Sequence, residues 1–141
     1  MTLPSVRTRA VLGTAVLALV LLLVWWWPDS GDSTGVTVEG SSSTYTVRIR
    51  LPHPSPAPGE AEIVVVRRDR AVLDLDQVTV AASMPSMGHT MAALTAQPDG
   101  PGRYRADGRL FLMAGSWQLS VRLHSADGTD VVTLPVTVPV A

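Results

Sequence analysis

Apolar and polar residues alternate with a period of two through most of the chain beyond residue 35. Successive side chains of a strand point to opposite faces, so this alternation predicts strands that bury one face. The clearest runs, with apolar residues at every second position, are 45–51, 78–84 and 117–123. A continuous apolar run at 63–66 predicts a central strand. Pro135 and Pro139 predict that the last run, 132–138, is an edge strand.

Turn-forming residues separate these runs. The strongest turn signals are the proline-rich segment 52–59, the segment 98–102 and the Asp127–Gly128 pair. Weaker strand patterns lie at 91–96 and 103–105. About seven to nine short strands, with turns roughly every 8–12 residues, are typical of an antiparallel all-β sandwich. We therefore expect one all-β sandwich domain over residues 36–141, with Trp117 as the largest residue of its core.

The N-terminal part has a different pattern. Residues 10–27 form an uninterrupted uncharged run that ends in three tryptophans. As a helix this run would reach roughly 27 Å, close to the hydrocarbon thickness of a bilayer. Arg7 and Arg9 precede it, and Asp29 follows it. The positive-inside rule then predicts a single-pass transmembrane anchor in the cell membrane, with residues 1–9 in the cytoplasm and the β domain outside.

A polar linker over residues 28–35 joins this predicted anchor to the β domain. The alternative for residues 10–27 is a cleaved signal peptide, which usually has a shorter apolar region followed by a small-x-small cleavage site. The run instead ends in Trp27 and Pro28, a poor context for cleavage. We therefore favour the uncleaved anchor.

Composition excludes several classes of function. The formal net charge is −1, and the balance of 11 basic and 12 acidic residues gives no support to nucleic-acid binding. The chain contains no cysteine, which excludes disulfides, thiolate metal sites and a cysteine nucleophile. No nucleophile elbow, His-Glu-x-x-His, P-loop or dinucleotide-binding motif occurs. We therefore expect that the protein is not an enzyme.

One stretch carries most of the candidate chemistry. Residues 84–91, MPSMGHTM, hold three of the five methionines and one of the three histidines. Thioether sulfur is a soft ligand that selects Cu(I), and imidazole also suits copper. Met84, Met87 and His89 are close enough in sequence for a turn to bring them to one metal ion. The alternative is structural, because methionines fill gaps at the edges of cores and a lone loop histidine is commonly a surface residue.

Three motifs give the chain a resemblance to a known family. These are the segments 84–89 (MPSMGH), 102–104 (GRY) and 111–119 (FLMAGSWQL). In this order they resemble the YtkA-like family and, more loosely, the FixH-like family, and the strand pattern extends the likeness over 36–138. The resemblance implies a membrane-anchored, immunoglobulin-like β-sandwich that handles copper or assists a copper oxidase. It also implies that Met84, Met87 and His89 are ligands, with Met113 as a further sulfur if its strand end lies beside the loop.

Two functions follow as expectations. The first is a membrane-anchored extracytoplasmic copper-binding accessory domain, a chaperone or sensor that holds Cu(I), or alternatively Cu(II), at the loop. Its partner would be a copper acceptor or a respiratory oxidase under assembly in the membrane. The alternative is an immunoglobulin-like interaction module without metal, in which the methionine-rich loop docks on a membrane protein partner.

Overall fold

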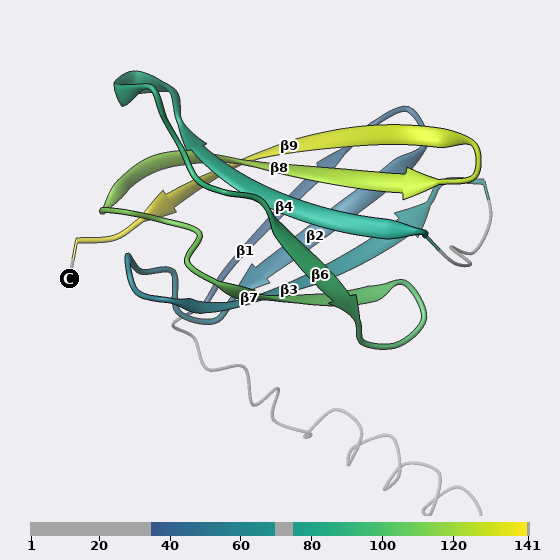
Figure 1. The fold of residues 1–141 in the computed structure, drawn as a ribbon, viewed down its shortest axis with the longest axis horizontal. Coiled ribbons are helices and arrows are strands. Elements are labelled where there is room, and N and C mark those ends of the chain that lie inside the picture. The colour runs from purple at the N-terminus through teal and green to yellow at the C-terminus, as the bar shows by residue number, and fades with distance from the viewer. Residues whose placement is uncertain (1–34, 70–74, 141) are drawn as a thin grey trace, which may run out of the picture. The chain divides into compact units, whose positions relative to one another are not determined.

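The computed structural model describes residues 35–69 and 75–140. This part of the chain is all-β, with nine antiparallel strands and one short 3₁₀ helix, η1 (Figure 1). The elements are β1 (Val36–Ser41), β2 (Tyr45–Leu51), β3 (Gly59–Arg67), β4 (Gln77–Met84), η1 (Pro85–Met87), β5 (His89–Thr90), β6 (Leu94–Pro98), β7 (Arg103–Gly108), β8 (Gly115–Ser125) and β9 (Gly128–Val138). The prediction of an all-β domain beyond residue 35 is thus confirmed.

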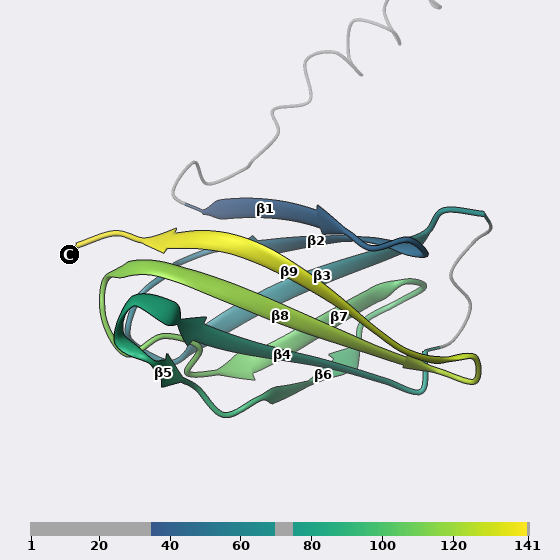
Figure 2. The same ribbon diagram turned by 90° about the horizontal axis from the view of Figure 1, so that it is seen from above.

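The strands form one continuous ladder in the order β1-β2-β3-β7-β6-β4-β8-β9, with β5 attached to β4. β6 joins the two halves, because it pairs with β4 through Val80↔Leu94 and with β7 through Gln97↔Arg105. The two ends of the ladder then approach each other, since a Cβ added to Gly40 of β1 would lie 3.0 Å from the Cγ of Leu134 in β9. The domain is therefore nearly a closed barrel (Figure 2).

Alternating burial along the strands builds one apolar core. β2, β4 and β8 bury every second residue, as their sequence patterns predict. Trp117 is the largest fully buried side chain, and Phe111 packs against it edge-to-face at 5.6 Å between ring centroids. All core residues lie between Tyr45 and Val138, so the described domain contains its own core.

Two sequence-based boundaries need correction. Residues 91–96 were expected to form one strand, but the chain pairs at His89–Thr90, leaves the ladder, and pairs again from Leu94. The break lets the chain leave the end of β4 and reach β7, which a pattern of alternating residues cannot show. The turn expected at residues 98–102 also begins one residue later, because Pro98 is still the last residue of β6.

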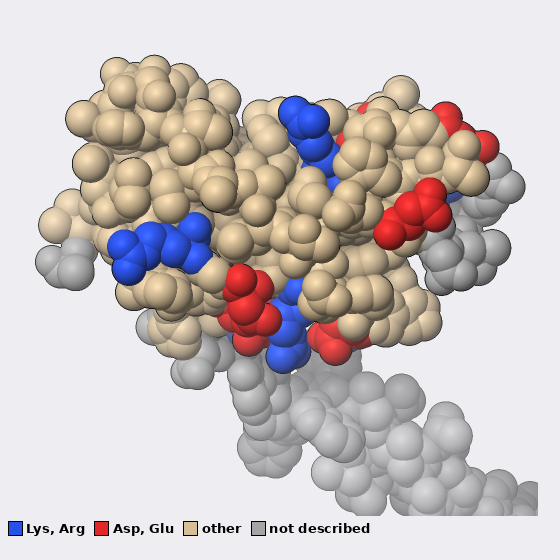
Figure 3. All heavy atoms as spheres, viewed as in Figure 1, with Lys and Arg blue, Asp and Glu red and all other residues tan. Residues whose placement is uncertain are grey.

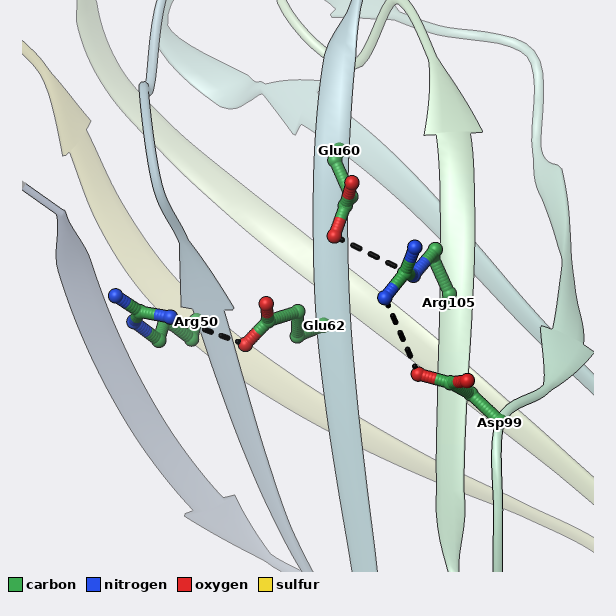
Figure 4. Close-up of polar contacts among 5 residues, drawn as sticks. All are labelled: Arg50, Glu60, Glu62, Asp99 and Arg105. Atoms are coloured by element: carbon green, nitrogen blue, oxygen red, sulfur yellow. Dashed lines mark hydrogen bonds and ion pairs between the residues drawn. The ribbon is translucent and has the colours of Figure 1, made fainter.

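Ion pairs lie on the outer surface of β2, β3 and β7 (Figure 4). Arg50 lies 3.3 Å from Glu62, and Arg105 bridges Glu60 and Asp99 at 3.3 Å each. All these groups are at least one-third exposed, and such pairs contribute only about 0–1 kcal/mol each. They therefore support the strand register more than they stabilise the fold.

The barrel has two chemically different ends. We call one the methionine end, which is formed by residues 51–59, 84–91, 109–115 and 136–140. These segments lie together on the left in Figures 1 and 2, where β2, β4 and β9 finish and β3 and β8 begin. We call the opposite end the hairpin end. It contains the β8–β9 turn, the end of β3, the start of β4 and the β6–β7 turn (Figure 1). No helix within the described residues is long and apolar enough to cross a membrane. The predicted anchor, residues 10–27, and all of the predicted linker except Gly35 lie outside the described residues.

Candidate functional site

The methionine turn, residues 84–91, reverses the chain at the end of β4. Met84 has extended backbone angles, φ −113° and ψ 93°, as expected for a residue before proline. η1 then makes a single turn, and Gly88 ends it with φ 66°, its N–H donating to the carbonyl oxygen of Pro85 at 3.3 Å. A glycine takes this left-handed conformation without the steric cost of a Cβ. The chain folds back at Gly88, so that His89 pairs with Met84 across β4 and β5.

The donors of the turn differ sharply in exposure. Met84 is the last core residue of β4 and is only 4% exposed, whereas Met87 is 56% exposed and His89 is exposed beside it. The position of Met84 therefore fits both the metal-ligand hypothesis and the structural alternative, because the residue packs in the core and also adjoins the turn. Met87 and His89 are open to a ligand from solvent.

Strand register sets the direction of these side chains. Met84 and His89 are directly paired across the β4–β5 ladder. The ladder continues to Met91, whose N–H donates to the carbonyl oxygen of Ala82 at 2.8 Å. Directly opposed residues of antiparallel strands share a face, so Met84, His89 and Met91 lie on the same face. Pairing thus brings the turn's only imidazole to the face that carries two sulfurs.

Met91 is a candidate donor that the sequence analysis missed. It is half-buried and packs against the core. The signal was present, because His89 and Met91 are two residues apart and residues at this spacing share a face of a strand. It was missed because Met91 was assigned to a strand separate from the turn.

Met113 lies in the loop between β7 and β8, close to the turn in space. Its carbonyl oxygen accepts a hydrogen bond of 3.1 Å from Nε1 of Trp117, and its side chain is 38% exposed. Two residues later, a Cβ added to Gly115 would lie 3.0 Å from the methyl carbon of Met84. The structure therefore places the segment of Met113 beside the end of β4.

The other two histidines belong to segments outside the turn. His53 is exposed in the proline-rich loop. His124 is half-buried at the hairpin end, with Nδ1 2.9 Å from the hydroxyl of Thr129. Across residues 35–69 and 75–140, no three His, Cys, Asp or Glu side chains come together in a group that could hold a metal ion. The candidate donors at the turn are instead thioethers and one imidazole.

Comparison with known proteins decides the family. The model of the YtkA-like family matches residues 39–122, which is more than half of the chain. The chain belongs to the YtkA-like family. No curated protein and no solved structure matches it.

The matched region of this YtkA-like domain runs from β1 into β8. It includes Met84, Met87, His89 and Met113, and it ends before β9, the strand that completes the ladder. The looser likeness to the FixH-like family stays a prediction.

Proposed function

We propose that this YtkA-like domain binds one copper ion at the methionine turn, as Cu(I), through Met87, His89 and Met84. The observation that carries the proposal is the pairing of Met84 with His89 across β4 and β5, next to the exposed Met87. Met91 and Met113 are available as further sulfurs. Three neutral donors of this kind match the preference of Cu(I) for soft ligands.

The donor chemistry suits reversible binding. The chain has no cysteine, and thioethers bind metal without losing a proton and without forming disulfides. His89 must be neutral to bind, so protons compete with copper and affinity falls as the imidazole becomes protonated. The exposure of Met87 and His89 leaves room for an incoming ligand, which favours transfer of the ion to an acceptor.

The finer parts of the proposal rest on the sequence and on the family. The domain would be an extracytoplasmic, immunoglobulin-like accessory module, held at the cell membrane by residues 10–27. It would act without catalysis, as a copper chaperone or sensor, with a copper acceptor or a respiratory oxidase under assembly as its membrane partner. What supports this is the family membership, the predicted anchor and the donor set of the turn.

A Cu(I) competition titration tests the site. Residues 33–141 would be titrated against a colorimetric Cu(I) chelator, in parallel with the Met87→Ala/His89→Ala variant. The parent should bind one equivalent and the double variant should lose it. The matched control is His53→Ala, which removes an exposed histidine outside the turn and should bind like the parent. A folded parent that binds no copper, or equal affinity in parent and double variant, would contradict the site.

A second candidate function is the interaction module without metal. Met87, Leu112 and Met113 are all exposed at the methionine end, and methionines suit adaptable contact surfaces. In this case a cross-linked membrane protein partner should be retained after copper is chelated and in the His89→Ala variant. Loss of the partner under either condition would favour the copper-dependent function.

A further inference from the structure

Charge is distributed very unevenly between the two ends of the barrel. The segments of the methionine end contain a single charged residue, Arg109. The whole stretch 77–98, which includes the methionine turn, has none, and Figure 3 shows the surface over this turn free of Lys, Arg, Asp and Glu. The hairpin end, in contrast, carries the charged residues Arg67, Arg68, Asp69, Asp76, Asp99, Asp127 and Asp130.

The uncharged end also exposes apolar side chains. Met87 is 56% exposed and projects from the turn, and Leu112 is 45% exposed in the β7–β8 loop. Met113 adjoins Leu112, and Val140, at 87%, follows β9. Of the six large apolar residues that are exposed within the described part of the chain, four lie at this end, and they come from three separate segments.

The chain also enters the domain at this end. β1 begins with Val36, which pairs with Leu51 at the end of β2. Gly35 lies against the same place, since a Cβ added to it would be 3.2 Å from the carbonyl oxygen of Leu51. The apolar run ends at Trp27, and the eight residues 28–35 can span at most about 29 Å. If residues 10–27 span a bilayer, a tether of this length keeps the methionine end within reach of that bilayer.

We propose that the methionine end rests on the lipid bilayer and inserts Met87, Leu112, Met113 and Val140 into its interfacial region. The lone Arg109 is exposed, where its guanidinium can meet lipid phosphates while its stem follows the apolar surface. The proposal goes beyond copper binding and does not require it. It assumes that the predicted anchor, residues 10–27, tethers the domain to the membrane.

Lipid fits this surface better than a protein partner does. The depression beside it, between the proline-rich loop and Leu110–Phe111, encloses only about 10 Å³, which is too small to receive a side chain. Specific protein interfaces combine an apolar centre with a polar rim of direct hydrogen bonds. A bilayer needs only protruding uncharged side chains with few charges among them, as found here.

The absence of native cysteine allows a clean test. Full-length protein would carry a single cysteine at Met87→Cys or Leu112→Cys, labelled with an environment-sensitive nitrobenzoxadiazole dye. Ala126→Cys, exposed in the β8–β9 turn at the hairpin end, is the matched control. Each variant would be reconstituted into phosphatidylcholine vesicles with a copper chelator present, and quenched either by nitroxide lipids labelled near the headgroup or by aqueous iodide.

We expect labels at residues 87 and 112 to be quenched by nitroxide lipids severalfold more than the label at 126, and to be shielded from iodide. Adding Leu112→Asp to the Met87→Cys variant should reduce the lipid quenching, because it places a charge on the contact surface. Equal quenching at all three positions would overturn the proposal and leave a protein partner as the occupant of this end. Because copper is absent, neither result depends on the metal site.

Discussion

The methyl group of Met84 lies directly against Gly115, so that a Cβ added at Gly115 would come within 3.0 Å of the Met84 Cε. This contact joins the end of β4 to the beginning of β8. It also links the buried donor of the methionine turn to the segment of Met113. The position of Met84, and with it the geometry of the candidate site, therefore depends on the absence of a side chain at residue 115.

Gly115→Ala should destabilise the domain and displace Met84. The substitution introduces the clash and also places a Cβ at φ 137°, a region that L-residues rarely adopt. Gly128→Ala is the matched control, because its φ is 129° but nothing lies within 4 Å of the added carbon. Backbone strain should cost both variants about 1–3 kcal/mol. Urea denaturation of residues 33–141 should show a larger loss for Gly115→Ala, and equal losses would argue against the contact.

Trp117→Phe should loosen the loop of Met113. The change removes the indole N–H, which donates a hydrogen bond to the carbonyl oxygen of Met113. The carbonyl oxygen then loses this donor. We expect a loss of about 1–3 kcal/mol in the free energy of unfolding. Amide hydrogen exchange should also accelerate in residues 112–116. Unchanged exchange in that loop, despite a loss of global stability, would show that the hydrogen bond does not hold it.

Gly40→Val should open the contact between the two ends of the ladder. The new side chain would meet Leu134 and Val132 at 3.0–3.1 Å from its Cβ, together with the backbone oxygen of Thr133. Such overpacking commonly costs about 1–3 kcal/mol. Gly59→Val, where the nearest atom lies 3.9 Å away, is the comparison. Hydrogen exchange in β1 should rise only in the Gly40 variant, and equal protection in both would contradict the close approach of β1 to β9.

Arg105→Gln should have a small effect on stability. The residue bridges Glu60 and Asp99 on the outer surface, but its side chain is 45% exposed. Solvent and salt screen such pairs, so we expect a loss below about 1 kcal/mol. Thermal unfolding at low and high salt checks this, because the difference between parent and variant should shrink at high salt. A loss of several kilocalories per mole in the free energy of unfolding would mean that the ion pairs of Arg105 are a major source of stability.

Met91→Leu should separate packing from metal binding at the candidate site. Leucine preserves most of the apolar volume, so the stability should change by less than about 1.5 kcal/mol. It removes the sulfur that shares a face with Met84 and His89, and the competition titration should therefore show weaker Cu(I) binding. Identical affinities for the variant and the parent would remove Met91 from the donor set.

The alternating pattern was sufficient to predict most of the strands, but we expected a sandwich and the strands instead form one continuous ladder that is nearly a closed barrel. β2, β4 and β8 each bury every second residue along most of their length, which gives their sequences a period of two. The pattern failed around residues 91–96, where the chain leaves the end of β4 and crosses to β7. Strand pairing across such a gap depends on partners distant in sequence, which local alternation does not encode.

The candidate site was predictable in composition but not in arrangement. The proline after Met84 and the glycine before His89 account for the extended end of β4 and for the fold-back of the chain. The sequence could not reveal that Gly115 adjoins Met84, because β4 and β8 become neighbours only through the strand order of the whole ladder. The role of Met91 depended in the same way on the register between β4 and β5.

The approach of β1 to β9 has a consequence for the behaviour of the protein at high concentration. Unpaired strand edges recruit other chains and start aggregation. Here the first and last strands of the ladder shield one another, and Pro135 removes one N–H group from β9. A second molecule therefore finds these two edges partly covered by each other, which disfavours edge-to-edge pairing when the domain is crowded onto a surface at high density.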